Sequence, residues 1–135
     1  MPLRLDHVAL SVGDLDAACE FYSRAFEFAR QLKFELAPHP IRGLMLRHES
    51  GMRLELFERE GSAPGVQGAT PIEALATRGY GHFAFAAPDI DVLFAQALGA
   101  GASAVVEPAP SPEPGVRFAF VADPEGNLVE LVELA

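Results

Sequence analysis

Two histidines and two glutamates occupy matching positions in the two halves of this chain. His7 precedes Glu55 by 48 residues, and His82 precedes Glu130 by the same interval. A shift of 75 residues places His7 over His82 and Glu55 over Glu130. Imidazole and carboxylate groups together suit a borderline divalent cation such as Ni, Co, Zn, Fe or Mn. Two equivalent halves would bring all four groups to a common axis, and the sequence therefore predicts a metal site.

Glu130 belongs to an apolar run, between Val129 and Leu131. A buried carboxylate without a partner is energetically unfavourable, and a bound cation would remove that penalty. Each histidine alone could equally be a structural residue, and the four together could be scattered charges on a polar sheet face. The repetition of both pairs favours the metal site.

The repeat includes more than the four candidate ligands. Residues 7–16 lie over residues 82–91 and repeat His, Ala, Asp and Asp, while Gly51 falls under Gly126 and Glu58 under Glu133. Alternating apolar residues, turn residues and helix-capping aspartates predict a β-α-β-β-β order in each half. The four ligands are expected on strands. The expected strands are 5–12, 28–36, 41–48, 52–58, 81–86, 104–106, 116–122 and 128–134, and the expected helices are 14–26 and 89–98.

The length of 135 residues fits one domain, here called 1–135. Within it we expect a first module over about 3–58, a linker over about 59–79 and a second module over about 80–135. Residues 71–77 in the linker have weak helical character. Cys19 falls in the apolar stripe of the first helix and is expected in the core.

Composition excludes several classes of function. Ten Lys plus Arg against nineteen Asp plus Glu argue against binding to nucleic acid or to an anionic membrane surface. No signal peptide or membrane-spanning segment is expected, because no long apolar run is present. One cysteine cannot form an intrachain disulfide, which fits a cytoplasmic location.

With these motifs the chain resembles the vicinal-oxygen-chelate superfamily, also called the glyoxalase, bleomycin-resistance and extradiol-dioxygenase group. The resemblance covers essentially the whole chain. It implies an α+β fold in which two tandem βαβββ modules form a cup-shaped, eight-stranded, barrel-like sheet around one divalent ion. The ion would lie within one chain or between two chains, and a homodimer is expected. The segments that carry the resemblance are 5–15, 21–22, 53–57, 81–85 and 123–131.

Among members of this group, glyoxalase I is the most similar. It isomerises a glutathione hemithioacetal through an enediolate and uses a His-Glu-His-Glu ligand set. This resemblance implies a small-molecule substrate with vicinal oxygens, Glu130 as the catalytic base and Glu55 as its counterpart on the other side of the substrate. Ser11 and Arg59 stand where bacterial enzymes of this type have glutathione-binding residues. Arg47, Arg53 and Arg59 could bind an anionic substrate or could be ordinary surface charges.

The sequence leaves four alternative functions to consider. A methylmalonyl-CoA-epimerase-like isomerase is suggested by the segment 70–79 before His82. Extradiol dioxygenases and fosfomycin-type thiol transferases use two His and one carboxylate, so Glu55 argues against them. The alternative without catalysis is a metal-free binding protein of the bleomycin-sequestering kind, which would not need all four ligands.

Overall fold

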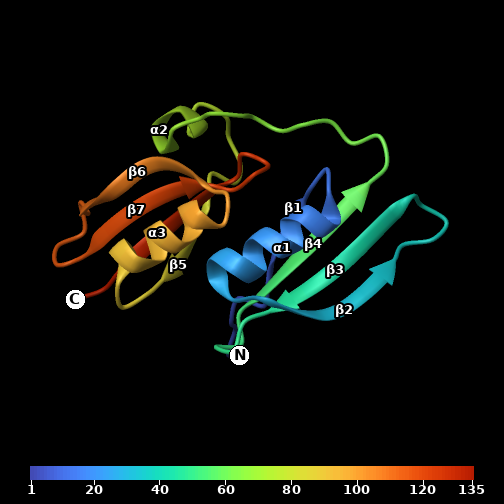
Figure 1. Ribbon diagram of the computed structural model, residues 1–135, viewed down its shortest axis with the longest axis horizontal. Helices are drawn as coiled ribbons and strands as arrows, with labels where there is room; N and C mark the ends of the chain where they lie inside the picture. Colours follow the sequence, from blue (N-terminus) through green and yellow to red (C-terminus); the bar gives the residue numbers. More distant parts are fainter. The chain divides into compact units, whose positions relative to one another are not determined.

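The computed structural model describes residues 1–135, which divide into two compact units, Met1–Pro64 and Gly65–Ala135. Each unit holds one four-stranded sheet and one long helix (Figure 1). The predicted α+β class and the tandem β-α-β-β-β order are therefore confirmed, with all eight strands present. None of the helices is long and apolar enough to span a bilayer.

In the first unit the sheet order is β1-β4-β3-β2. Strand β1 runs parallel to β4, and the remaining neighbours are antiparallel. Helix α1 packs against β3 and β4. The elements are β1 Val8–Ser11, α1 Leu15–Phe26, β2 Ala29–Glu35, β3 Ile41–Arg47 and β4 Arg53–Arg59.

The second unit repeats this arrangement with the order β5-β8-β7-β6, in which β5 runs parallel to β8. Its long helix packs against β6, β7 and β8. A short helix precedes the repeated elements, and its N-cap Thr70 forms a capping box with Glu73. The elements are α2 Pro71–Ala74, β5 Phe83–Ala86, α3 Ile90–Gly99, β6 Ser103–Pro110, β7 Arg117–Ala122 and β8 Leu128–Glu133.

Helix α1 begins where the sequence predicts it. The Asp14 side chain accepts a hydrogen bond from the backbone N–H of Ala17 at 2.9 Å, which satisfies one of the free donors at the helix start. One face of the helix is buried against the sheet and includes Cys19, at 3% exposure. The prediction of Cys19 as a core residue is confirmed.

The strand that carries each candidate glutamate follows a glycine turn. Gly51 has a φ of 95° and Gly126 a φ of 90°, a backbone conformation that glycine adopts without strain. The next residues form β4 and β8, which place Leu54, Leu56 and Leu131 in the core at 1% exposure or less. Each glutamate is held on the opposite face of a strand whose other side is firmly packed.

The prediction for the strand that follows α3 is wrong. We expected a short strand over 104–106 followed by a proline-rich loop, but β6 continues through Glu107 and Pro108 to Pro110. Strand β6 lies at the edge of its sheet, and its register with β7 shifts twice. A strand at the edge forms hydrogen bonds with a neighbour on one side only. A proline whose nitrogen faces the open side removes no hydrogen bond from the sheet, so the strand tolerates both prolines.

Each long helix also receives a cap from the last strand of its own sheet. In the first unit, Glu58 accepts a hydrogen bond from the backbone N–H of Leu15 at 2.7 Å and one from Arg42 at 2.7 Å. In the second unit, Glu133 accepts from the backbone N–H of Ile90 at 3.0 Å. The two glutamates are 75 residues apart, so the repeat has preserved a hydrogen bond from the first backbone N–H of the helix to a carboxylate on the last strand.

We expect Glu58→Ala to lower the free energy of unfolding at pH 7 by about 1–2 kcal/mol, because the helix loses a cap and Arg42 loses its partner. These two contacts lower the pKa of Glu58 below its ordinary value of 4.5. The stabilisation is therefore present above pH 4.5 and is lost as the pH falls further. Urea unfolding at several pH values measures the difference.

The exposed Glu60 has no side-chain partner and provides the matched control, Glu60→Ala. A loss for Glu58→Ala that is no larger than the loss for this control at pH 7 would contradict the capping role.

Candidate metal centre

The first unit brings His7 and Glu55 together. Strand β1 pairs with β4 so that Ala9 lies opposite Glu55, and His7 precedes Ala9 by two residues on the same face. His7 Nε2 is 3.4 Å from Glu55 Oε1. The Glu55 side chain is 18% exposed and the His7 side chain 36% exposed, so the pair is accessible from solvent.

The second unit brings His82 and Glu130 together in the same way. Ala84 lies opposite Glu130 in the parallel pairing of β5 with β8. His82 Nε2 is 3.0 Å from Glu130 Oε2, and the side chains are 34% and 23% exposed. The predicted repetition of a His–Glu pair is thus present in the geometry of both units.

We expected both histidines to lie within strands, and this prediction is wrong. His7 comes directly before β1 and His82 directly before β5, whereas Glu55 and Glu130 lie within β4 and β8. The parallel ladder begins one residue later in each case. The imidazoles therefore stand at the end of the sheet, where their ring nitrogens face the glutamates of the neighbouring strand.

The donor atoms fit a divalent cation. Two ligands about 2.1 Å from one ion lie about 3.0 Å apart at a right angle and about 3.4 Å apart at the tetrahedral angle. The separations of 3.0 Å and 3.4 Å between imidazole nitrogen and carboxylate oxygen are compatible with these values, and the 3.0 Å contact is also the length of a direct hydrogen bond between His82 and Glu130. Imidazole nitrogen and carboxylate oxygen together are ligands that suit a borderline divalent ion.

The two histidines differ in their surroundings. His7 Nδ1 lies 2.7 Å from Asp6 Oδ2, and Arg53 donates to the same oxygen at 2.7 Å. Hydrogen bonds from His7 and Arg53 hold the pKa of Asp6 at about 2. Asp6 was not among the predicted site residues, although its position next to the candidate ligand His7 was a usable signal. The ring of His82 instead meets the edge of Phe120, with ring centroids 4.8 Å apart.

The three arginines considered for anion binding share the face of Glu55. Arg53 lies opposite Arg47 in the antiparallel pairing of β3 with β4, and Arg59 lies two residues beyond Phe57 on the same strand. Residues opposite each other in such a pair project to the same side. Arg53 is held by Asp6 and by Gln31, whereas Arg47 and Arg59 are exposed.

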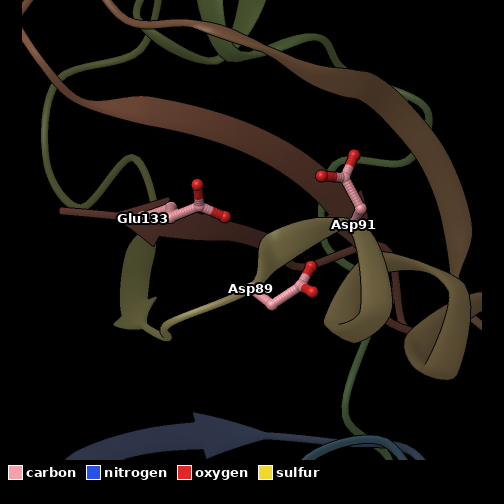
Figure 2. A group of neighbouring side chains, drawn as sticks. All are labelled: Asp89, Asp91 and Glu133. Carbon is pink, nitrogen blue, oxygen red and sulfur yellow. The ribbon is translucent and has the colours of Figure 1, made fainter. Parts of the chain in front are cut away.

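A third group of acidic side chains, which the sequence analysis did not propose as ligands, gathers at the start of α3. Figure 2 shows Asp89 at the N-cap of α3, Asp91 in its first turn and Glu133 on β8. Their oxygens lie within 4.8 Å of one another, close enough to hold a metal ion.

One positively charged side chain, Arg117, contacts this cluster. Arg117 donates to Asp91 at 2.7 and 3.2 Å and reaches Glu133 at 3.5 Å. The hydrogen bond from Arg117 lowers the pKa of Asp91. Glu133 also accepts from the backbone N–H of Ile90, as Glu58 does at the start of α1. We assign the cluster to capping of α3, and the His–Glu pairs remain the better candidate ligands.

Comparison with known proteins agrees with the geometry. A family model described as Glyoxalase/Bleomycin resistance protein/Dioxygenase superfamily matches residues 4–131. A probable lactoylglutathione lyase from Vibrio cholerae is 29% identical over 133 residues, which cover 96% of this chain and 90% of the relative. Lactoylglutathione lyase GLX1 from Arabidopsis thaliana is also 29% identical over 133 residues, and they cover 96% of this chain and 44% of that protein.

Solved structures give the same result. The crystal structure of glyoxalase I from Zea mays matches with a TM-score of 0.77 and 25% identity, over 98% of this chain and 45% of the maize chain. The chain thus spans less than half the length of the two plant proteins.

Proposed function

The chain belongs to the Glyoxalase/Bleomycin resistance protein/Dioxygenase superfamily, and from this premise we propose that it is a divalent-metal-dependent lyase or isomerase of the glyoxalase I kind. Its substrate would be a small molecule with vicinal oxygens, converted through an enediolate. The observation that carries the proposal is the duplicated His–Glu pair, with nitrogen and oxygen at the separation of two ligands on one ion. Residues 1–135 would act as one domain, in a cytoplasmic homodimer.

We propose His7, Glu55, His82 and Glu130 as the ligands of one ion per site, with Ni, Co, Zn, Fe and Mn as the candidates. Such an ion, when bound, supplies Lewis-acid stabilisation of negative charge on substrate oxygens. The two histidines and two glutamates would hold it through one imidazole nitrogen or one carboxylate oxygen each. Their side chains are partly exposed to solvent.

Glu130 is proposed as the base that moves a proton between adjacent substrate carbons, with Glu55 as its counterpart. Phe120 lies opposite Glu130 in the pairing of β7 with β8 and is 5% exposed. This ring would provide an apolar wall on one side of the carboxylate. A proton taken up at a Glu130 oxygen would therefore be held near the substrate rather than lost to solvent.

The curated relatives named lactoylglutathione lyase make the glutathione hemithioacetal of methylglyoxal the first substrate to test. Arg47 and Arg59 lie on the face of Glu55 and offer guanidinium groups to an anionic part of a substrate. Because Ser11 and Arg59 replace the glutathione-binding residues expected from the resemblance, another thiol or a different acidic group could occupy this place.

The test is an activity screen of the protein loaded separately with each candidate metal. The substrates are the methylglyoxal hemithioacetal, methylmalonyl-CoA, a set of catechols, and fosfomycin with a thiol. We expect isomerisation of the hemithioacetal, followed at the absorbance of the product thioester. Oxygen uptake with a catechol, together with no turnover of the hemithioacetal, would overturn the proposal.

We further expect the protein to retain about one divalent ion per site when purified without a chelator, because four charged or strongly donating ligands bind such ions tightly. Elemental analysis of the purified protein measures the content. Dialysis against a chelator should abolish activity, and one equivalent of the native metal should restore it. Full activity in protein shown to be free of metal would contradict this expectation.

A further inference from the structure

The second ring nitrogen of His7 is held by a chain of side chains from three parts of the first unit. His7 Nδ1 lies 2.7 Å from Asp6 Oδ2, and Arg53 Nη2 donates to the same oxygen at 2.7 Å. Arg53 Nη1 donates to Gln31 Oε1 at 3.1 Å, which joins β4 to β2. The orientation of His7 is therefore linked to the sheet as well as to its own backbone.

The second unit has no such chain. The 75-residue shift places Gly81 at the position of Asp6 and Leu128 at the position of Arg53. Gly81 has no side chain that could accept a hydrogen bond, and Leu128 is an apolar residue at 6% exposure. His82 has ring packing against Phe120 instead. The two His–Glu pairs, equivalent in sequence spacing, are thus supported differently.

The Asp6 contact has a chemical consequence for His7. A carboxylate that accepts from the Nδ1–H group fixes the proton on Nδ1 and leaves the Nε2 lone pair free to bind a metal. It also restricts rotation of the ring and makes Nε2 a stronger donor. Nε2 is the nitrogen that faces Glu55, so the tautomer favoured by Asp6 is the one the proposed site requires.

We propose that Asp6, held in place by Arg53, is a positioning residue that preorganises His7 as a metal ligand and makes the first His–Glu pair the stronger half of the site. The inference rests on the proposed function, since it assigns a role relative to the proposed ion. It also assigns different roles to the two pairs. The more firmly held pair would bind the ion more strongly, and Glu130 in the other pair would serve as the base.

The repeat provides matched variants for the test. Asp6→Gly and Arg53→Leu give the first unit the residues of the second, and Asp6→Asn keeps the shape of the side chain but removes its charge. Asp16→Asn is the control, because Asp16 is an exposed carboxylate that pairs with Arg30 at 3.3 Å. Calorimetric titration of metal-free protein with Zn²⁺ and with Co²⁺ gives affinity and stoichiometry, and circular dichroism checks the fold.

We expect Asp6→Gly to weaken metal binding by about 10- to 100-fold at unchanged stoichiometry, with smaller losses for Asp6→Asn and Arg53→Leu and less than about twofold for Asp16→Asn. Nitrogen-15 spectra of the metal-free protein give an independent reading. They should show the Nδ1–H tautomer of His7 in the wild type and a tautomer mixture in Asp6→Gly.

The results separate this inference from the proposed function. Wild-type protein that binds no ion would overturn both. Wild-type protein that binds one ion per site, with Asp6→Gly binding equally well, would overturn the role of Asp6 alone. Equal losses in Asp6→Gly and Asp16→Asn would also overturn it, because the effect would then come from net charge.

Discussion

Replacing Glu130 with glutamine should lower kcat for the hemithioacetal by about 10²- to 10⁴-fold, the range that a positioned general base contributes. Glutamine has the shape of glutamate and keeps an oxygen that can face His82 Nε2, now 3.0 Å from Glu130 Oε2. Its amide cannot take up the substrate proton. Since Glu130 is partly exposed and lies on the face opposite the core residues Val129 and Leu131, the fold should be retained.

The kcat of Glu130→Gln is to be compared with that of Glu55→Gln, both measured at saturating metal. Both variants alter a proposed ligand, but only Glu130 is proposed as the base, so kcat should fall further for Glu130→Gln. Glu113→Gln, at an exposed turn, should match the wild type. A larger fall for Glu55→Gln would exchange the two assignments, and wild-type kcat in Glu130→Gln would exclude Glu130 as the base.

The sequence was sufficient to predict that each unit holds one His–Glu pair. The pairing of β1 with β4 and of β5 with β8 is set by a repeated order of elements, and this pairing alone brings His7 to Glu55 and His82 to Glu130. The 48-residue interval is the length of one α-β-β excursion that returns to the neighbouring strand. The 75-residue repeat in the sequence therefore gives the two His–Glu pairs equivalent positions in their own units.

Contacts between distant residues of unlike type could not be predicted in this way. Arg53 reaches Asp6 across 47 residues, and neither residue has a counterpart in the repeat. The proline-containing strand β6 was missed for a related reason. Prolines normally end a strand, and only the sheet order shows that β6 lies at an edge where they are tolerated.

Neither the sequence repeat nor the strand pairing within each sheet shows that the two pairs bind a single ion. Each pair is complete inside its own unit, Met1–Pro64 or Gly65–Ala135. An imidazole and one carboxylate are a weak ligand set, whereas two of each bind a divalent ion strongly. The functional proposal therefore depends on cooperation between units, and that dependence can be measured.

Removing either pair should abolish metal binding altogether. In His7→Ala/Glu55→Ala and in His82→Ala/Glu130→Ala, two ligands remain, and we expect the bound metal to fall from about one ion per chain to nearly none, with activity lost in both. Elemental analysis after gel filtration, with circular dichroism as the check on folding, measures the loss. Retention of half the ions in each variant would show that each pair binds an ion of its own.

Mixing the two inactive variants then distinguishes a site within one chain from a site shared between two chains. If both pairs of a site come from one chain, every site in the mixture lacks one pair and the mixture stays inactive. If the pairs come from two chains of a homodimer, random reassociation rebuilds about a quarter of the sites, and activity returns to that extent. A return of activity after unfolding and refolding the mixture, but not after refolding either variant alone, would establish the shared site.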